Sequence, residues 1–136
     1  MDTKVLDVVF LSHIHDDHCI RLLLLHKQGY KGNTIMSEET KNRLPQAFKK
    51  WRHDKEKKEQ IPCSTKEEQV IRTTTCSYKI KGKWTIINDH VCFQWFLSGH
   101  VIGGVPYLIQ MENQLIYYSG DFSSNFNPYY ITYHSF

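Results

Sequence analysis

The chain has 136 residues, of which 40% are hydrophobic and 23% are charged, and its formal net charge is +3 at pH 7. These values predict one globular domain with a hydrophobic core, and a mildly basic balance that accommodates an anionic substrate without requiring one. The sequence predicts no membrane-spanning helix, because no apolar run reaches the roughly 20 residues that such a helix needs.

The first part of the chain alternates extended and helical patterns. The run from Val5 to Leu11 is apolar and rich in β-branched residues, which predicts a strand buried on both faces. A helix is expected from about Asp17 to Gln28, because acidic residues suit its first turn and Gly29 can end it. This order of strand, loop and helix is typical of α/β proteins.

A second strand and further helices follow. Residues 34–36 predict a short strand, and Ser37 is a candidate N-cap for the helix after it. Pro45 is expected either to start a new helix or to break this one. The sequence Ser-Thr-Lys-Glu at 64–67 has the form of a capping box, so another helix is expected from about Thr65 to Arg72.

The pattern changes after Tyr78, where short apolar runs alternate with turn residues. Four strands are expected there: from Trp84 to Ile87, from Val91 to Phe96, from Pro106 to Met111 and from Gln114 to Ser119. We therefore predict an α/β fold with helices against one sheet and a second, largely antiparallel layer formed by these strands.

The cysteine pattern and the N-terminal sequence favour a location inside the cell. Cys19, Cys63, Cys76 and Cys92 are scattered without a CxxC pair, which favours reduced thiols over a disulfide framework. The N-terminus also lacks the hydrophobic region of a secretory signal. We predict a cytoplasmic protein, with a nuclear location as the alternative in a eukaryote.

The most informative stretch is HIHDDH, which runs from His13 to His18 directly after the first predicted strand. Side chains alternate along an extended chain, so His13 and His15 should face the same way, while Asp17 and His18 are carried past them into the helix. Neutral imidazoles and carboxylates are ligands that a cation such as Zn²⁺ accepts. The sequence therefore favours a metal site over a solvated turn.

Two further motifs join this string in the same order as in a known family. SGHVIGGVPYLI runs from Ser98 to Ile109, and YYSGDFS runs from Tyr117 to Ser123. Together with HIHDDH, these motifs resemble the metallo-β-lactamase superfamily and, within it, the β-CASP branch of RNA-processing nucleases. The resemblance implies a partial αββα sandwich and hydrolysis of phosphodiester bonds by a hydroxide held between two zinc ions.

The resemblance also implies roles for individual residues. Asp17 would bind metal and orient the attacking water as a catalytic residue. Asp121 would bridge the two ions, since one carboxylate has two acceptor oxygens. The full set of implied metal ligands is His13, His15, Asp17, His18, His100 and Asp121, with the second of the two zinc sites expected to be the weaker.

Other residues are expected to lie outside the site. Asp16 should point away from the metals at the start of the helix, and Cys19 should be a buried thiol. The remaining histidines lack ligand spacing; these are His26, His53, His90 and His134. The segment from Lys41 to Lys58 is rich in lysine and arginine, and it could contact an RNA backbone or simply form a solvated helical face.

The chain also departs from the family pattern. A complete member has strands before HxHxDH and an inserted domain after GDFS, so residues 1–136 are expected to form a single domain that lacks both. Three functions stay open: a nuclease core acting on RNA or another phosphodiester, a hydrolase of a small ester, thioester or lactam, and a metal-binding fragment without activity. No membrane partner is expected, and the oligomeric state does not follow from the sequence.

Overall fold

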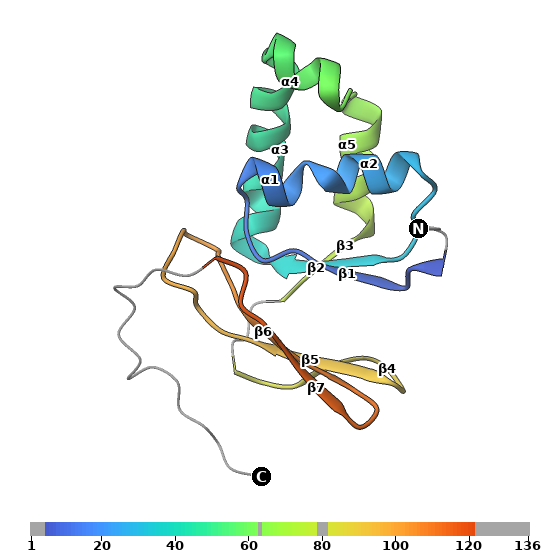
Figure 1. Ribbon diagram of the computed structural model, residues 1–136, viewed down its shortest axis with the longest axis vertical. Coiled ribbons are helices and arrows are strands. Elements are labelled where there is room, and N and C mark those ends of the chain that lie inside the picture. The colour runs from blue at the N-terminus through green and yellow to red at the C-terminus, as the bar shows by residue number, and fades with distance from the viewer. Residues whose placement is uncertain (1–4, 63, 79–81, 122–136) are drawn as a thin grey trace.

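The computed structural model describes residues 5–62, 64–78 and 82–121, which form two sheets with helices over the outer face of one of them (Figure 1). The first sheet is parallel and the second is antiparallel, so the fold is the partial αββα sandwich that the sequence indicated. No helix in these ranges is both long and apolar enough to cross a bilayer.

The parallel sheet has the order β1-β2-β3, with β1 at Val8–Phe10, β2 at Asn33–Ser37 and β3 at Thr75–Tyr78. Parallel neighbours require long crossover connections, which the helices between these strands supply. β1 is shorter than predicted and half-buried, rather than buried on both faces, because it is the edge strand of this sheet as described. β3 was not predicted as a separate strand.

The helix predicted from Asp17 to Gln28 is divided in two. α1 covers Asp16–Cys19 and α2 covers Arg21–Lys27, with Ile20 between them. The backbone N–H of Leu23 bonds the carbonyl of Ile20, three residues back, at 3.0 Å. Such a tightened turn interrupts the pattern of bonds four residues apart.

α3 runs through Glu38–His53 without a break, so the expectation that Pro45 starts or breaks a helix was wrong. Proline inside a helix costs about 3 kcal/mol. The helix persists because Leu44 and Phe48 are fully buried on its inner face. Ser37 caps α3 as predicted, accepting a hydrogen bond from the N–H of Thr40 at 3.2 Å.

The two remaining helices are α4 at Lys55–Gln60 and α5 at Thr65–Thr74, which begins at the predicted residue and ends two residues later than predicted. A salt bridge between Arg52 and Glu68 connects α3 to α5.

The antiparallel sheet confirms the four strands predicted after Tyr78. Its order is β4-β5-β6-β7, and each strand pairs with the next along the chain. Pro106 immediately precedes β6, where it removes no hydrogen bond from the sheet. The strands are β4 at Thr85–Asn88, β5 at Val91–Trp95, β6 at Tyr107–Met111 and β7 at Gln114–Tyr118.

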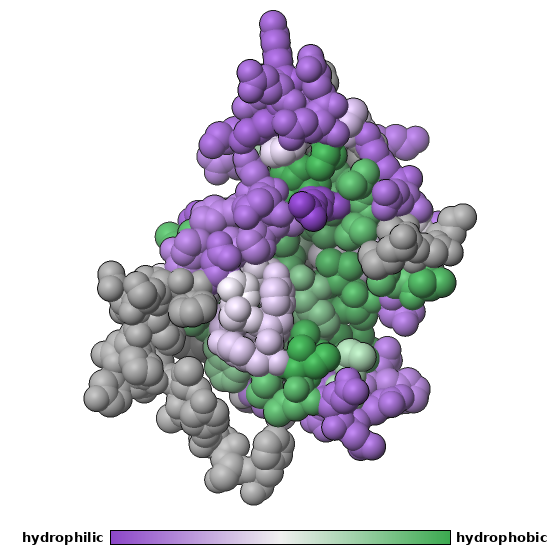
Figure 2. All heavy atoms as spheres, viewed as in Figure 1, coloured by the Kyte–Doolittle hydropathy of each residue, from purple (hydrophilic) through white to green (hydrophobic). Residues whose placement is uncertain are grey.

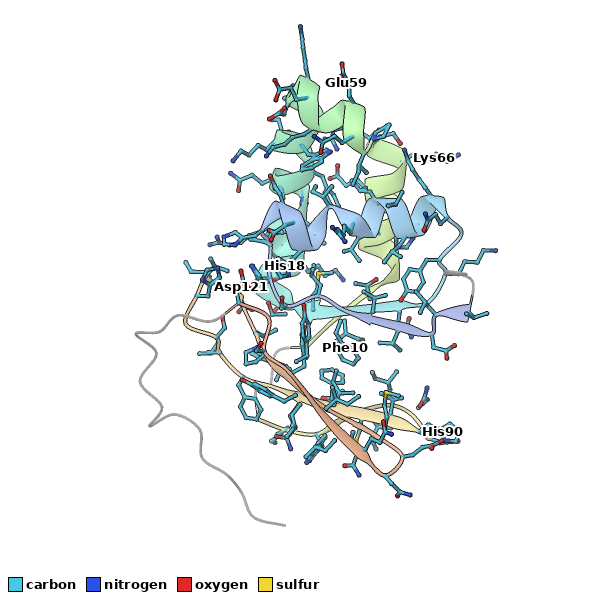
Figure 3. The ribbon with its side chains drawn as sticks, viewed as in Figure 1. Phe10, His18, Glu59, Lys66, His90 and Asp121 are labelled. Atoms are coloured by element: carbon cyan, nitrogen blue, oxygen red, sulfur yellow. The ribbon has the colours of Figure 1, made fainter. Side chains whose placement is uncertain are left out.

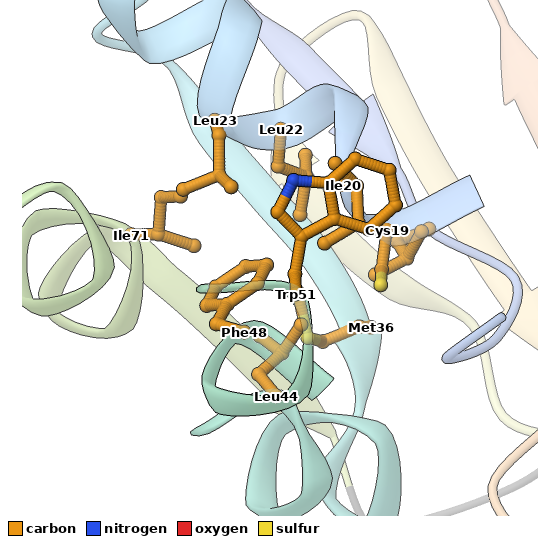
Figure 4. Close-up of a cluster of buried hydrophobic side chains, with 10 residues drawn as sticks. Cys19, Ile20, Leu22, Leu23, Met36, Leu44, Phe48, Trp51 and Ile71 are labelled. Atoms are coloured by element: carbon orange, nitrogen blue, oxygen red, sulfur yellow. The ribbon is translucent and has the colours of Figure 1, made fainter. Parts of the chain in front are cut away.

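One hydrophobic cluster lies between the helices and the parallel sheet (Figure 4). The indole of Trp51 packs in it, and its Nε1 donates to the carbonyl of Ile61 at 3.0 Å. Figure 2 shows hydrophilic side chains gathered at the α4 end of the molecule. The buried members are Leu11, Cys19, Ile20, Leu22, Leu23, Met36, Leu44, Phe48, Trp51 and Ile71.

A second cluster joins the two sheets. Phe10 points from β1 toward the antiparallel sheet (Figure 3), with its ring centroid 5.4 Å from that of Phe93 and 5.1 Å from that of Tyr107. The hydroxyl of Tyr107 donates to the carbonyl of Leu11 at 2.9 Å. These contacts fix the end of β1 against β6, and the chain enters the HIHDDH string directly afterwards.

Candidate metal centre

The HIHDDH string begins three residues after β1 ends. The backbone of His15 is extended, with φ −61° and ψ 148°, so His13 and His15 have the alternation expected of a strand. The carbonyl of His15 then accepts hydrogen bonds from the N–H groups of His18 and Cys19, at 3.0 and 2.9 Å. This first turn of α1 brings the ring of His18 to 4.1 Å from that of His13, measured between centroids.

The antiparallel sheet supplies the other candidate ligands. His100 lies in the loop between β5 and β6, and Asp121 follows β7 closely. Gly120 makes the approach of Asp121 feasible, because it has a φ of 54° and a Cβ on it would lie 2.4 Å from the Cβ of Ser12. Figure 3 shows Asp121 beside His18.

The loop that carries His100 is fixed against α3. The carbonyl of Gly103 accepts hydrogen bonds from the hydroxyls of Ser37 and Thr40, at 2.7 and 3.0 Å. Gly103 has a φ of 85°, and a Cβ there would meet the N–H of Thr40 at 2.9 Å. A residue with a side chain would therefore displace this loop, and His100 with it.

Four of the predicted ligands form one compact group: His13, His15, His100 and Asp121, whose donor atoms all lie within 4.8 Å of one another. Nδ1 of His15 is 3.1 Å from Nε2 of His13 and 3.3 Å from Nε2 of His100. Oδ2 of Asp121 is 3.5 Å from Nε2 of His13 and 3.6 Å from Nε2 of His100. Ligand atoms around a tetrahedral zinc with bonds of about 2.1 Å are roughly 3.4 Å apart, so this donor set fits such an ion.

The two other predicted ligands, His18 and Asp17, lie near the second oxygen of Asp121. Its second oxygen, Oδ1, is 3.6 Å from Nε2 of His18. That nitrogen is in turn 3.5 Å from Oδ2 of Asp17, whose side chain is 78% exposed. The structure thus places one oxygen of Asp121 toward each group of candidate ligands. The metal roles of all six residues stay predictions.

Electrostatics favour metal binding at the buried end of the site. Burial, together with the neighbouring rings of His18 and His15, lowers the pKa of His13 to about 4, against an opposing effect of Asp121. His13 is therefore neutral near pH 7, as a metal ligand must be. Nδ1 of His13 lies 2.9 Å from the hydroxyl of Ser12, which leaves Nε2 to face the other donors.

Most of the residues that were predicted to lie outside the site are described by the structure, and none of these belongs to the donor group. The carboxylate of Asp16 points away, forming a 2.5 Å salt bridge with Lys57. Cys19 is buried, and burial raises the pKa of its thiol to about 12, so it is not a thiolate ligand. His26 is half-buried, and burial lowers its pKa as well. His53 and His90 are exposed. His134 lies outside the described residues, as do Phe122 and Ser123.

Sequence reasoning missed three supporting residues. The hydroxyl of Tyr118 donates to that of Ser12 at 3.2 Å, which connects β7 to the residue that orients His13. The hydroxyl of Ser98 accepts from the N–H of His100 at 3.2 Å. Ser12 and Ser98 lie within two positions of a motif histidine, and Tyr118 belongs to the third motif. Their closeness to the motifs was the signal in the sequence that could have identified them as supporting residues.

The sequence is similar to those of several known proteins. The chain is 32% identical over 132 residues to cleavage and polyadenylation specificity factor 73 of Drosophila melanogaster, covering 90% of this chain and 18% of that protein. It is 28% identical over 129 residues to Integrator complex subunit 11 of Danio rerio, covering 89% of this chain and 21% of that protein. It is 26% identical over 130 residues to endoribonuclease ysh-1 of Neurospora crassa, covering 90% of this chain and 15% of that protein. No family model matches.

The class of protein follows from the fold, the motifs and these relatives. Over about 90% of its length, the chain is related to proteins of the β-CASP branch of the metallo-β-lactamase superfamily. It spans about a fifth or less of the length of the curated relatives that it matches.

Proposed function

We propose that the chain carries the metal centre of a zinc-dependent hydrolase that cleaves phosphodiester bonds in RNA. The observation that carries this proposal is the group formed by His13, His15, His100 and Asp121, whose donor atoms come from separate parts of the chain and lie within 4.8 Å of one another. One of these relatives is named a cleavage and polyadenylation specificity factor, and another is named an endoribonuclease.

The residues divide between two ions. His13, His15 and His100 would hold the first, and Asp17 and His18 the second, with Asp121 between them. When bound, a pair of zinc ions supplies a nucleophilic water near neutral pH and positive charge against the phosphate oxygens. The first site has four donors already grouped, whereas the second has an exposed Asp17, so we expect the second to bind more weakly.

The protein's own residues prepare this site before any metal arrives. Ser12 and Tyr118 hold the ring of His13, and the hydroxyl of Ser98 holds the backbone of His100. Asp17 is the most exposed carboxylate of the set, so it can reach a water molecule next to the substrate and accept its proton. A water-accessible carboxylate beside the half-buried imidazole of His18 is a suitable arrangement for orienting an attacking water.

Metal analysis after dialysis and cleavage of a labelled RNA test the proposal. We expect about one tightly held zinc per chain and a weaker second, with the tight site lost in His100→Ala. RNA cleavage, where it occurs, should be abolished in His100→Ala and Asp17→Ala, while Asp17→Ala should keep the tight zinc. His90→Ala, which changes an exposed histidine in a turn, is the control. A wild-type chain that retains no zinc would refute the proposal, and zinc binding without any cleavage would support the inactive alternative.

A further inference from the structure

A cavity of about 390 Å³ lies beside the metal centre, on the side of His15 that faces α3. His15 is both a wall of this cavity and a member of the donor group. Whatever occupies the cavity is therefore adjacent to the candidate metals. The lining residues are Ile14, His15, Asp16, Arg43, Gln46, Ala47 and Lys50.

The helical wall of this cavity is one face of α3. Arg43 and Lys50 are seven positions apart, which is close to two full helical turns, so both project from the same side about 10 Å apart along the axis. Gln46 lies between them and can donate hydrogen bonds through its amide. The opposite face of α3 is buried through Leu44 and Phe48, which fixes the direction in which the cavity face points.

The charge of the cavity is positive. Arg43 and Lys50 are exposed, and neither forms an ion pair with any other described residue. The one carboxylate in the lining, that of Asp16, is already paired with the ammonium group of Lys57 at 2.5 Å. The cavity therefore presents two unneutralised cations to a ligand that reaches the metal centre.

We infer that Arg43 and Lys50 bind the backbone phosphates of the RNA strand on the His15 side of the cleaved bond. This inference rests on the proposed function and extends it, because it gives the substrate a path along α3 rather than a single phosphate at the metals. Arginine and lysine close to an anionic strand release its counterions, and two cations this far apart can contact different phosphates. Of the basic segment from Lys41 to Lys58, only these two basic residues line the cavity.

The test measures binding of a labelled oligouridylate by fluorescence anisotropy over a range of salt concentrations. Arg43→Gln with Lys50→Gln should weaken binding by about 10-fold and reduce the slope of log affinity against log salt by about 1.4, or about 0.7 for each lost phosphate contact. The matched control is Lys49→Gln with Lys55→Gln, which removes the same charge from exposed residues outside the cavity. The control should change affinity and slope by much less.

Each outcome is decisive. Equal losses in both double variants would show diffuse attraction rather than a site, and no loss in either variant, or no binding by the wild type, would also overturn the inference. An oligothymidylate should lose the same factor, because the contacts are to phosphates; a loss confined to DNA would contradict an RNA path. Zinc content measured in every variant separates the two proposals: a chain without zinc refutes the proposed function, whereas the binding difference tests the cavity alone.

Discussion

The two halves of the molecule bury their apolar side chains differently. The helical half, consisting of β1–β3 and α1–α5, surrounds a closed cluster in which Leu23, Leu44 and Phe48 have no exposed surface. The antiparallel half, β4–β7, buries one face against β1, while Leu115 and Tyr117 on β7 are 57% and 63% exposed. We therefore expect core substitutions in the helical half to cost more stability than substitutions on the open face of β7, while the antiparallel half supplies His100 and Asp121.

The candidate metal centre lies where these halves meet, and two tyrosine hydroxyls join the halves directly before His13. Tyr107 donates to the carbonyl of Leu11, and Tyr118 donates to the hydroxyl of Ser12. Both bonds end on the residues just before His13. We call the contacts that Leu11 and Ser12 make with these two tyrosines the seam. A substitution at the seam should lower the affinity for metal by more than its effect on the free energy of unfolding predicts.

The largest expected effect comes from the core of the helical half. Phe48→Ala should lower the free energy of unfolding by about 3–5 kcal/mol, because it leaves a cavity in a closed cluster. Leu115→Ala, on the open face of β7, should change it by no more than about 0.5 kcal/mol. Urea unfolding of the metal-free chain measures both. Comparable losses would mean that the open face is covered in solution and that the contrast between the halves is wrong.

The next effect concerns the seam at Ser12. Ser12→Ala removes the hydroxyl that holds Nδ1 of His13, and changes to such supporting groups typically cost about 10–100-fold in metal affinity. Competition with a chromophoric chelator measures the zinc affinity, and His90→Ala, an exposed change in a turn, is the control. An unchanged affinity in Ser12→Ala would show that packing alone orients His13.

A pair of tyrosine variants distinguishes the seam from the helical half. Tyr107→Phe removes a hydrogen bond between the halves, and Tyr30→Phe removes one within the helical half, from its hydroxyl to the carbonyl of Asn33 at 2.6 Å. Each should cost about 1–2 kcal/mol of stability, because a buried or half-buried acceptor loses its partner. Only Tyr107→Phe should also lower zinc affinity. Equal effects on zinc would contradict a special role for the seam.

The smallest expected effect is a pH dependence in the helical half. Burial lowers the pKa of His26 below its ordinary value of 6.5, and none of the residues that the structure describes hydrogen-bonds its Nε2. Below pH 6.5 the unfolded chain binds a proton at this position that the native chain resists, so the free energy of unfolding falls as the pH drops toward the lowered pKa.

Unfolding of the metal-free chain at about pH 7.5 and about pH 5.5 measures this dependence. His26→Phe, which keeps a ring against Tyr30, should reduce the loss of stability at the lower pH. His13 adds a dependence of the same sign, so part of the loss should persist in this variant. His53→Gln, an exposed change, should leave the dependence as in the wild type, and a wild-type loss in His26→Phe would contradict the role of His26.

Local patterns in the sequence predicted much of the fold. The strands after Tyr78 were found because turn residues bound each apolar run, and the cap at Ser37 was found because its hydroxyl acts on the N–H of Thr40, three residues away. The continuous α3 was not predicted, since burial of Leu44 and Phe48 outweighs the local cost of Pro45. The break between α1 and α2 at Ile20 was not predicted either, because no glycine, proline or capping residue marks it in the local sequence.

The sequence by itself determined the chemistry of the site: the HIHDDH string and its extended-then-helical geometry depend on neighbouring residues alone. Only the tertiary structure decided how distant donors meet. The approach of Gly120 to Ser12 brings one oxygen of Asp121 toward His13 and the other toward His18, both of them candidate ligands. The tertiary structure also decided which residues of the basic segment line the cavity. Because one face of α3 is buried, Arg43 and Lys50 on another face lie beside His15.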